Sequence, residues 1–229
     1  MIRVVLATLM TLALTGPIRA AVEIQEVTSP GGTEAWLVED HSIPFAALEI
    51  RFRGGTSLDA PGKRGVVNLM TGLIEEGAGD MDARAFAEAR DGLAASFEFD
   101  SHRDALTVSA RFLTENRDEA LALLREALIN PRFDEDAVER VRGQVLSVIR
   151  SEATDPDSMV TREFNAITYG DHPYATDPTG TIESVSALTR DDIVAAHKAV
   201  LVRDRIYVGA TGDITAEELG QILDFLFSD

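Results

Sequence analysis

The run of residues between Gly65 and Gly77 constrains the fold of this chain more than any other stretch. Its apolar residues recur at intervals of three and four positions: Val66, Leu69, Met70 and Leu73. Side chains with this spacing share one face of a helix, and a glycine stands at each end. We therefore predict a buried helix bounded by the two glycines.

Predicted strands and helices account for most of the remaining chain. Alternating apolar and polar residues predict strands at 22–27, 34–38, 45–52, 94–99, 105–112 and 205–210. Apolar stripes at helical spacing, with capping residues, predict helices at 82–90, 115–128, 134–152, 158–167, 181–185, 189–201 and 215–226. Strands and helices are partly segregated, which predicts an α+β fold: a largely antiparallel sheet covered by helices on one face.

The first twenty residues have the pattern of a secretory signal peptide. Arg3 precedes an apolar run at 4–14, and small residues end the segment at Ala20. A membrane anchor is the less favoured alternative, because a spanning helix needs about 20 apolar residues. We therefore expect a mature domain at 21–229, in the periplasm or secreted. The chain has no cysteine, so neither a disulfide nor a lipid on cysteine is available.

The composition indicates a soluble globular protein with an acidic surface. Hydrophobic residues make up 45% of the chain, and 39 acids against 21 bases give a formal net charge of −18. Such a surface would repel nucleic acid and anionic lipid, which bind basic patches. We interpret the acidity mainly as a contribution to solubility.

Segments along the whole chain resemble the insulinase/pitrilysin family, which includes the mitochondrial processing peptidases. Besides the helix after Gly65, they occur in family order: Gly54–Asp59, Phe133-Asp134, Asp155-x-Asp157, Gly170–Tyr174, Gly180–Ile182, Leu188–Asp192 and Val208–Asp213. Each motif alone is weak, but their common order makes the resemblance strong.

The resemblance implies that the catalytic chemistry of the family has been lost here. Active members carry His-x-x-Glu-His on the helix that follows Gly65, where two histidines bind zinc and the glutamate is the general base. In this chain Asn68 and Gly72 occupy the histidine positions, and Thr71 occupies the glutamate position. The third ligand would fall at about Ser147-Val148. We therefore expect no catalytic residue and no metal site, and the sequence identifies no substrate-binding residue.

No other histidine offers a convincing alternative metal site. His41, His102, His172 and His197 each lack a histidine or acidic residue four positions along a helix, and His41 is interpreted as a surface turn residue. Glu75 and Glu76 are adjacent, so a helix would point them about 100° apart, which is poor for chelation.

The resemblance also implies a function and a missing second half. Family members of the bacterial two-subunit type have two such halves, so we expect 21–229 to be the N-terminal half. The favoured hypothesis is a non-metal-binding subunit of a periplasmic two-subunit peptidase. It would close the cavity and bind peptide, while a homologous partner carries the zinc. The alternatives are a structural or peptide-binding protein without a role in proteolysis and, less favoured, an active zinc metallopeptidase.

Overall fold

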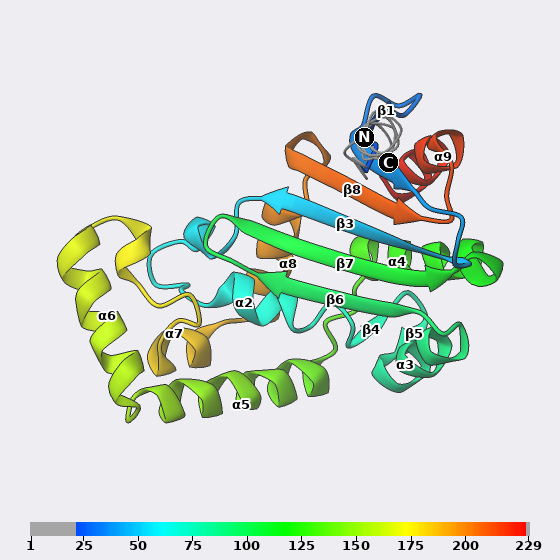
Figure 1. The fold of residues 1–229 in the computed structure, drawn as a ribbon. Helices are drawn as coiled ribbons and strands as arrows, with labels where there is room; N and C mark the ends of the chain where they lie inside the picture. The colour runs from blue at the N-terminus through cyan, green and yellow to red at the C-terminus, as the bar shows by residue number, and fades with distance from the viewer. Residues whose placement is uncertain (1–21, 228–229) are drawn as a thin grey trace, which may run out of the picture.

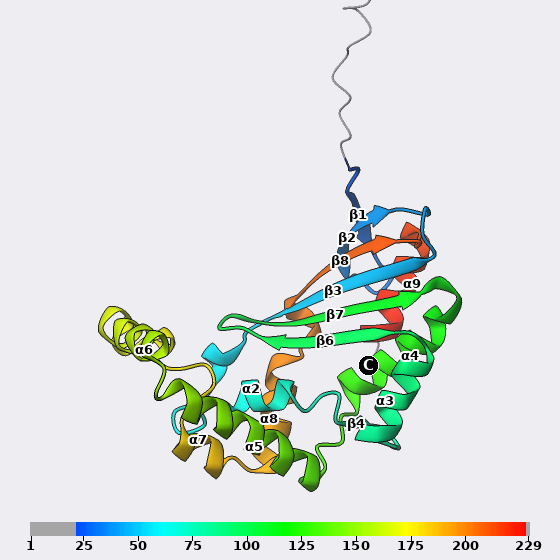
Figure 2. The ribbon, with the colours of Figure 1, turned by 60° about the horizontal axis from the view of Figure 1, so that its bottom comes forward.

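A six-stranded sheet with the strand order β1-β2-β8-β3-β7-β6 forms one layer of this computed structural model, which describes residues 22–227 (Figures 1 and 2). Neighbouring strands are antiparallel except β2 and β8, which run parallel. The strands are β1 (Gln25–Thr28), β2 (Glu34–Glu39), β3 (Phe45–Arg53), β6 (Ser96–Ser101), β7 (Ala105–Leu113) and β8 (Ile206–Gly212). A separate two-stranded sheet joins β4 (Gly77–Ala78) to β5 (Met81–Asp82).

Helices lie on one side of the large sheet, as Figure 2 shows. They are α2 (Val66–Thr71), α3 (Ala83–Gly92), α4 (Arg117–Ile129), α5 (Glu135–Glu152), α6 (Pro156–Tyr169), α7 (Ile182–Ala187), α8 (Arg190–Val200) and α9 (Ala216–Phe227). Short 3₁₀ turns occur at Thr56–Leu58, Thr114–Asn116, Pro173–Ala175 and Arg203–Arg205. The predicted α+β fold, a mostly antiparallel sheet with helices on one face, is confirmed.

The hydrophobic core lies between the sheet and these helices. Along β3, Leu48, Ile50 and Phe52 are buried, whereas Glu49 and Arg51 between them are exposed on the other face. This period of two is what a strand with one covered face produces. The core continues through α2, α4 and α9, whose apolar side chains are buried against the same face.

Capping residues begin several helices where the sequence predicts them. Thr189 and Asp192 form a reciprocal capping box at the start of α8, and Asp82 accepts a hydrogen bond of 2.8 Å from the Ala85 N–H. The prediction for α5 is only partly correct. Asp134 stands at its N-cap position without a side-chain capping bond, because its carboxylate accepts from the Arg132 guanidinium at 2.7 Å.

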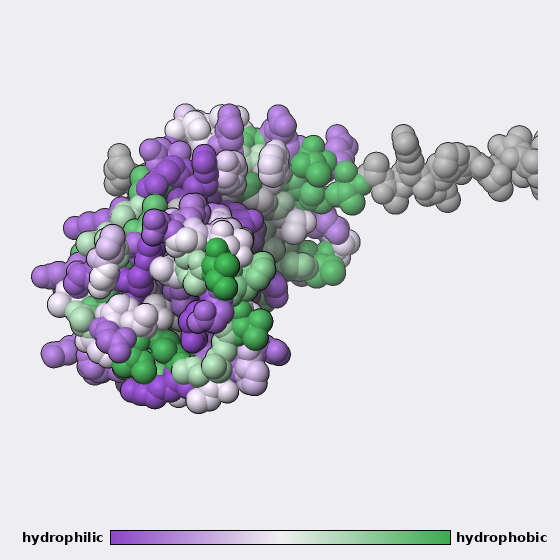
Figure 3. Space-filling view, turned by 90° about the vertical axis from the view of Figure 1, so that its left-hand side faces the viewer, coloured by the Kyte–Doolittle hydropathy of each residue, from purple (hydrophilic) through white to green (hydrophobic). Residues whose placement is uncertain are grey.

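Helix α6 projects from the body of the domain and buries none of its residues (Figure 2). Val160, Phe164 and Ile167 are exposed along it, so apolar side chains appear among charged ones on the end of the molecule seen in Figure 3. No helix within 22–227 is long and apolar enough to cross a membrane. The predicted signal peptide at 1–20 lies outside the described residues.

Candidate functional site

The short helix α2 is held at its N-terminus by backbone and side-chain contacts. Gly65 precedes the helix with φ 88°, and a Cβ there would lie 2.4 Å from the Thr179 carbonyl oxygen, so only glycine fits. Asp59 accepts hydrogen bonds from the N–H groups of Gly65 and Val67 at 2.7 and 3.1 Å. Burial raises the pKa of Asp59 to about 6, although both hydrogen bonds act in the opposite direction.

Helix α2 is buried as predicted, but it ends earlier than the apolar pattern suggests. The helix stops at Thr71, and Gly72 is its C-cap rather than an interior residue. The chain then tightens into i→i+3 bonds: the N–H of Leu73 donates to the Met70 carbonyl, and that of Ile74 to Thr71. Leu73 and Ile74 remain fully buried, so apolar spacing continues where the α-helix does not.

The three motif positions on α2 do not supply a zinc site. Asn68 accepts a hydrogen bond of 3.2 Å from the Ser101 hydroxyl at the end of β6. Thr71 is buried, and its hydroxyl donates to the Val67 carbonyl oxygen at 2.7 Å. Gly72 has no side-chain donor atom. Zinc in proteins takes Cys, His, Asp or Glu ligands, so this set of residues does not fit the metal.

The third expected position also lacks a ligand. It falls at about Ser147-Val148 on α5, where Val148 is exposed and has no metal-binding atom. Helix α5 nevertheless packs against α2, since a Cβ at Gly72 would lie 3.3 Å from the Val141 Cγ1. The structure therefore brings α2 and α5 together while neither provides a ligand at these positions.

The two glutamates that follow α2 are engaged in ion pairs. Glu75 meets the Arg90 guanidinium of α3 at 2.7 Å, and burial raises the pKa of its carboxyl group. Glu76 accepts two hydrogen bonds from Arg140 of α5, at 2.8 and 2.7 Å. These carboxylates tie α3 and α5 to the segment that follows α2, so both have a structural role in ion pairs.

Strand β6 is one edge of the large sheet and runs beside α2 (Figure 1). Its partner on one side is β7, and no described strand pairs with its other side. An edge strand presents unpaired N–H and C=O groups to which another extended chain can bond. The Ser101–Asn68 contact therefore places the degenerate helix next to a backbone edge able to accept a peptide.

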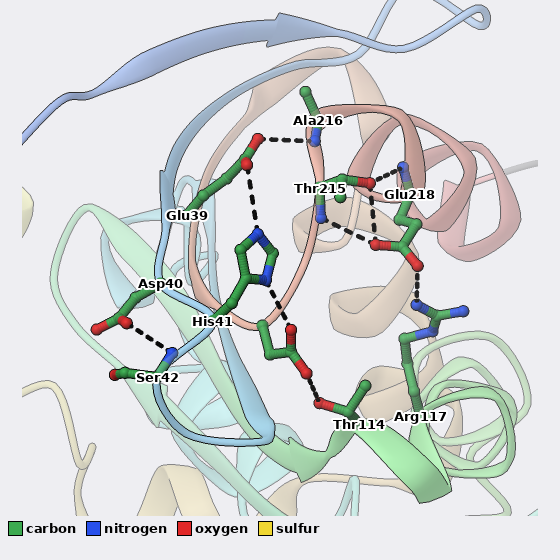
Figure 4. Close-up of polar contacts among 10 residues, drawn as sticks. Glu39, Asp40, His41, Ser42, Thr114, Arg117, Thr215, Ala216 and Glu218 are labelled. Carbon is green, nitrogen blue, oxygen red and sulfur yellow. Dashed lines mark hydrogen bonds and ion pairs between the residues drawn. The ribbon is translucent and has the colours of Figure 1, made fainter.

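A second polar cluster surrounds His41 in the turn between β2 and β3 (Figure 4). The His41 Nδ1 lies 2.7 Å from the Asp213 carboxylate, and its Nε2 lies 3.6 Å from Glu39. Asp213 also accepts a hydrogen bond of 2.8 Å from the Thr114 hydroxyl. The hydrogen bond to Asp213 raises the pKa of His41. His41 is a turn residue as predicted, but it has acidic partners that sequence spacing could not identify, because Asp213 is 172 positions away.

The geometry of this cluster suits a structural tie. The two carboxylates approach opposite nitrogens of one imidazole ring, so a single metal ion cannot contact all three side chains. Glu39 also accepts a hydrogen bond of 3.2 Å from the Ala216 N–H at the start of α9. The cluster thus links the β2–β3 turn to the segment that leads from β8 into α9.

The other histidines are dispersed. The His197 Nε2 lies 2.9 Å from the Leu128 carbonyl oxygen, and burial lowers the pKa of this imidazole. His172 Nδ1 accepts from the Tyr174 N–H at 3.2 Å. Among residues 22–227, no group of three or more His, Cys, Asp or Glu side chains could hold a metal ion.

Comparisons with known proteins agree with this architecture. A solved peptidase M16 inactive domain from Pseudomonas fluorescens superposes with a TM-score of 0.85 at 26% identity, covering 89% of this chain and 50% of that one. A Helicobacter pylori protein described as the non-peptidase homologue YmxG is 29% identical over 192 residues, covering 82% of this chain and 44% of that protein.

A more distant relative is described as a probable mitochondrial-processing peptidase subunit beta of Arabidopsis thaliana. It is 23% identical over 211 residues, which cover 92% of this chain and 40% of that protein. This chain therefore spans less than half the length of these two curated relatives. The model of the insulinase family, peptidase family M16, matches residues 35–181. The chain belongs to the insulinase family.

Proposed function

We propose that this chain is the non-catalytic subunit of a two-subunit insulinase-type peptidase, whose partner carries the zinc. The observation that supports this most directly is the contrast at α2. The family fold surrounds the helix, yet Asn68, Thr71 and Gly72 offer neither zinc ligands nor a general base. Relatives described as a non-peptidase homologue and as an inactive domain are consistent with the same role.

The contribution of this subunit would be to close the cavity and to bind peptide. Peptide would add to the free edge of β6 by backbone hydrogen bonds, with Asn68 and Ser101 at one end of that edge. Binding through the backbone accommodates many sequences, so the chain would hold substrate while the partner selects and cleaves the bond.

The direct test assays peptide hydrolysis by the partner with and without this protein. The partner is a homologue carrying His-x-x-Glu-His, produced separately and mixed with the full-length protein. We expect a complex on gel filtration and hydrolysis that requires both chains. A partner in which the motif glutamate is replaced by glutamine should form the complex and cleave nothing. A partner equally active alone, with no complex, would contradict the proposal.

A second measurement tests the role of the β6 edge. Substrate peptides methylated on alternate backbone nitrogens cannot add as a strand, because the outward N–H groups are blocked. With both subunits present, these peptides should be cleaved far more slowly than unmethylated ones. Equal cleavage rates for methylated and unmethylated peptides would show that peptide does not bind as a strand along β6. The subunit would then only close the cavity.

We also propose that the mature protein is exported to the periplasm or secreted. The support is the segment at 1–20, with Arg3 before an apolar run and Ala20 at its end. N-terminal sequencing of the natural protein should find a chain beginning at or near Ala21. An intact Met1 would contradict export with cleavage.

A structural or peptide-binding role without proteolysis is the main alternative. It would be supported by a stable complex with a protein that lacks His-x-x-Glu-His. An active zinc metallopeptidase is disfavoured by the same α2 residues, and a tightly held stoichiometric zinc in the purified chain would revive it.

A further inference from the structure

The cluster around His41 joins segments that are far apart in the sequence (Figure 4). The imidazole lies in the turn between β2 and β3, with Glu39 of β2 on one side and Asp213, which follows β8, on the other. Thr114, which follows β7, donates to Asp213, and Glu39 accepts from the Ala216 N–H at the start of α9. One side chain therefore stands where the β2–β3 turn meets the segment that leads from β8 into α9.

The two carboxylates set a requirement on the protonation of the ring. The His41 Nδ1 lies 2.7 Å from an oxygen of Asp213, and its Nε2 lies 3.6 Å from an oxygen of Glu39. A neutral imidazole has one N–H group, whereas the imidazolium has two. In the neutral ring, one nitrogen therefore turns a lone pair toward a carboxylate, and the two groups repel each other. Only the protonated ring attracts both carboxylates.

The other charges near the ring do not replace this cation. The charged groups that face the imidazole are Glu39 and Asp40 from the turn, Asp213 from the segment after β8 and, at longer range, Arg117 of α4 with its partner Glu218 of α9. Arg117 meets Glu218 at 2.7 Å, so its guanidinium is already paired. Within residues 22–227, His41 is the cation in direct contact with Glu39 and Asp213. Loss of its charge leaves these two carboxylates close together without a cation in contact.

The β2–β3 turn depends on this contact because the rest of the turn is open to solvent. Residues 40–44 are exposed. Two backbone hydrogen bonds close the base of the turn, one from the Asp40 N–H to the Gly212 carbonyl oxygen and one from the Thr114 N–H to the Pro44 carbonyl oxygen. The start of α9 has a cap of its own, formed with Glu218. Breaking the imidazole contacts would therefore release the turn from the start of α9 and leave the helix folded.

We propose that His41 forms a pH-dependent link between the β2–β3 turn and the segment that leads into α9. The link forms when the imidazole carries two protons, and it breaks when the ring loses one, which frees the turn at 40–44. Only residues of this chain take part, so the link stands or fails independently of the proposed function.

The direction of the pH dependence follows from the contacts of the ring. The hydrogen bond to Asp213 raises the pKa of His41 from its ordinary value of 6.5. The link is therefore complete below pH 6.5 and is lost as the pH rises through the raised pKa of the folded protein. The hydrogen bond from His41 lowers the pKa of Asp213, so this carboxylate stays ionised throughout. Added salt should weaken the link, because the ring and both carboxylates are partly exposed.

NMR spectroscopy of the mature protein tests the link directly. The nitrogen chemical shifts of the His41 ring give its pKa, and hydrogen exchange of the Asp40 and Ala216 amides reports the release of the turn. We expect His41 to titrate above pH 6.5. The protection of both amides, relative to the intrinsic exchange rate at each pH, should fall by roughly threefold or more between pH 6 and pH 9.

Three variants separate this link from other effects of pH. His41→Gln removes the charge, so both amides should show the lower protection at pH 6 as well as at pH 9. The matched control is His102→Gln, an exposed histidine in the turn between β6 and β7, and it should keep the pH dependence. Asp213→Asn keeps an acceptor for Nδ1 without the negative charge. It should lower the pKa of His41 and shift the release of the turn to lower pH by an equal amount.

Three results would overturn the proposal. The first is a pKa of His41 at or below 6.5 in the folded protein. The second is equal protection of the two amides at pH 6 and pH 9. The third is a loss of protection with rising pH that persists in His41→Gln, which would assign the release of the turn to another titrating group.

Discussion

The two faces of the large sheet differ in chemistry although their residues alternate along the same strands. On β3, Leu48 and Ile50 are buried under the helices, whereas Glu49 and Arg51 are exposed on the opposite face of the sheet, the open face. On β8, Val208 is buried and the adjacent Tyr207 is exposed. One face is thus covered by helices of this chain, and the core beneath them determines its stability. The other face keeps large side chains such as Trp36 and Tyr207 exposed within residues 22–227.

The largest expected effect contrasts neighbouring residues on the two faces. Ile50→Ala should lower the free energy of unfolding by about 2–4 kcal/mol, because it leaves a cavity at a fully buried position. Arg51→Ala, one position along β3, should change it by no more than about 0.5 kcal/mol. Urea denaturation of both variants measures the contrast. Similar losses in the two variants would show that the open face is also packed in solution.

The next effect concerns Asp59, the buried carboxylate on the covered side. Its pKa is about 6 in the fold against an ordinary value of 3.8, so between these two pH values the folded protein binds more protons than the unfolded chain. The contribution of Asp59 to stability is therefore greatest below pH 4 and falls as pH rises through 6. The loss is on the order of 2–3 kcal/mol at about 1.4 kcal/mol per pKa unit.

Asp59→Asn is the variant that tests this contribution. Asparagine does not titrate, so the variant should not lose this stability as the pH rises. Its unfolding free energy at pH 7, relative to that at pH 4, should therefore be higher than in the unmodified protein by the same amount. Denaturant titrations of both proteins at the two pH values give the comparison, in which the other titrating groups cancel. If the unfolding free energy changes equally between pH 4 and pH 7 in the two proteins, Asp59 keeps an ordinary pKa in the fold.

A smaller effect compares glycines on the two sides. Gly209→Ala should stabilise the fold by about 0.5–1 kcal/mol, because alanine costs less conformational entropy in a strand and meets no neighbour. Gly72→Ala should gain less, because its Cβ would lie 3.3 Å from the Val141 Cγ1. Thermal unfolding ranks the two variants. A larger gain in stability for Gly72→Ala would show that the Val141 side chain of α5 shifts to make room at little cost in energy.

The smallest expected effect is on metal binding. The triple variant Asn68→His, Thr71→Glu, Gly72→His should still hold no stoichiometric zinc, because the third position near Ser147-Val148 has no ligand. Adding Val148→Glu to the triple variant is the informative comparison, since it supplies a carboxylate from α5. Elemental analysis after dialysis measures zinc in each variant. Tight zinc in the triple variant alone would show that another residue serves as the third ligand.

Local sequence patterns predict many of the elements, and boundary errors occur where the backbone turns. The strand predicted at 94–99 is β6, Ser96–Ser101, because Ala94 adopts φ 50° and closes the end of α3 first. Helix α2 ends before Leu73 because the last turn tightens, although apolar spacing continues. Periodicity reports burial, and it does not distinguish an α-helix from a tighter turn at a helix end.

The sequence by itself determined the residues at the degenerate motif positions and the alternation that buries one face of the sheet. Both depend on residue identity and on the spacing of residues that are close together in the chain, so the sequence alone reveals them. Only the tertiary structure decided that His41 meets Asp213, that Asn68 meets Ser101, and that Trp36 lies beside Gly209. These contacts depend on strand order and register, and distant segments acquire both only when the sheet assembles around its core.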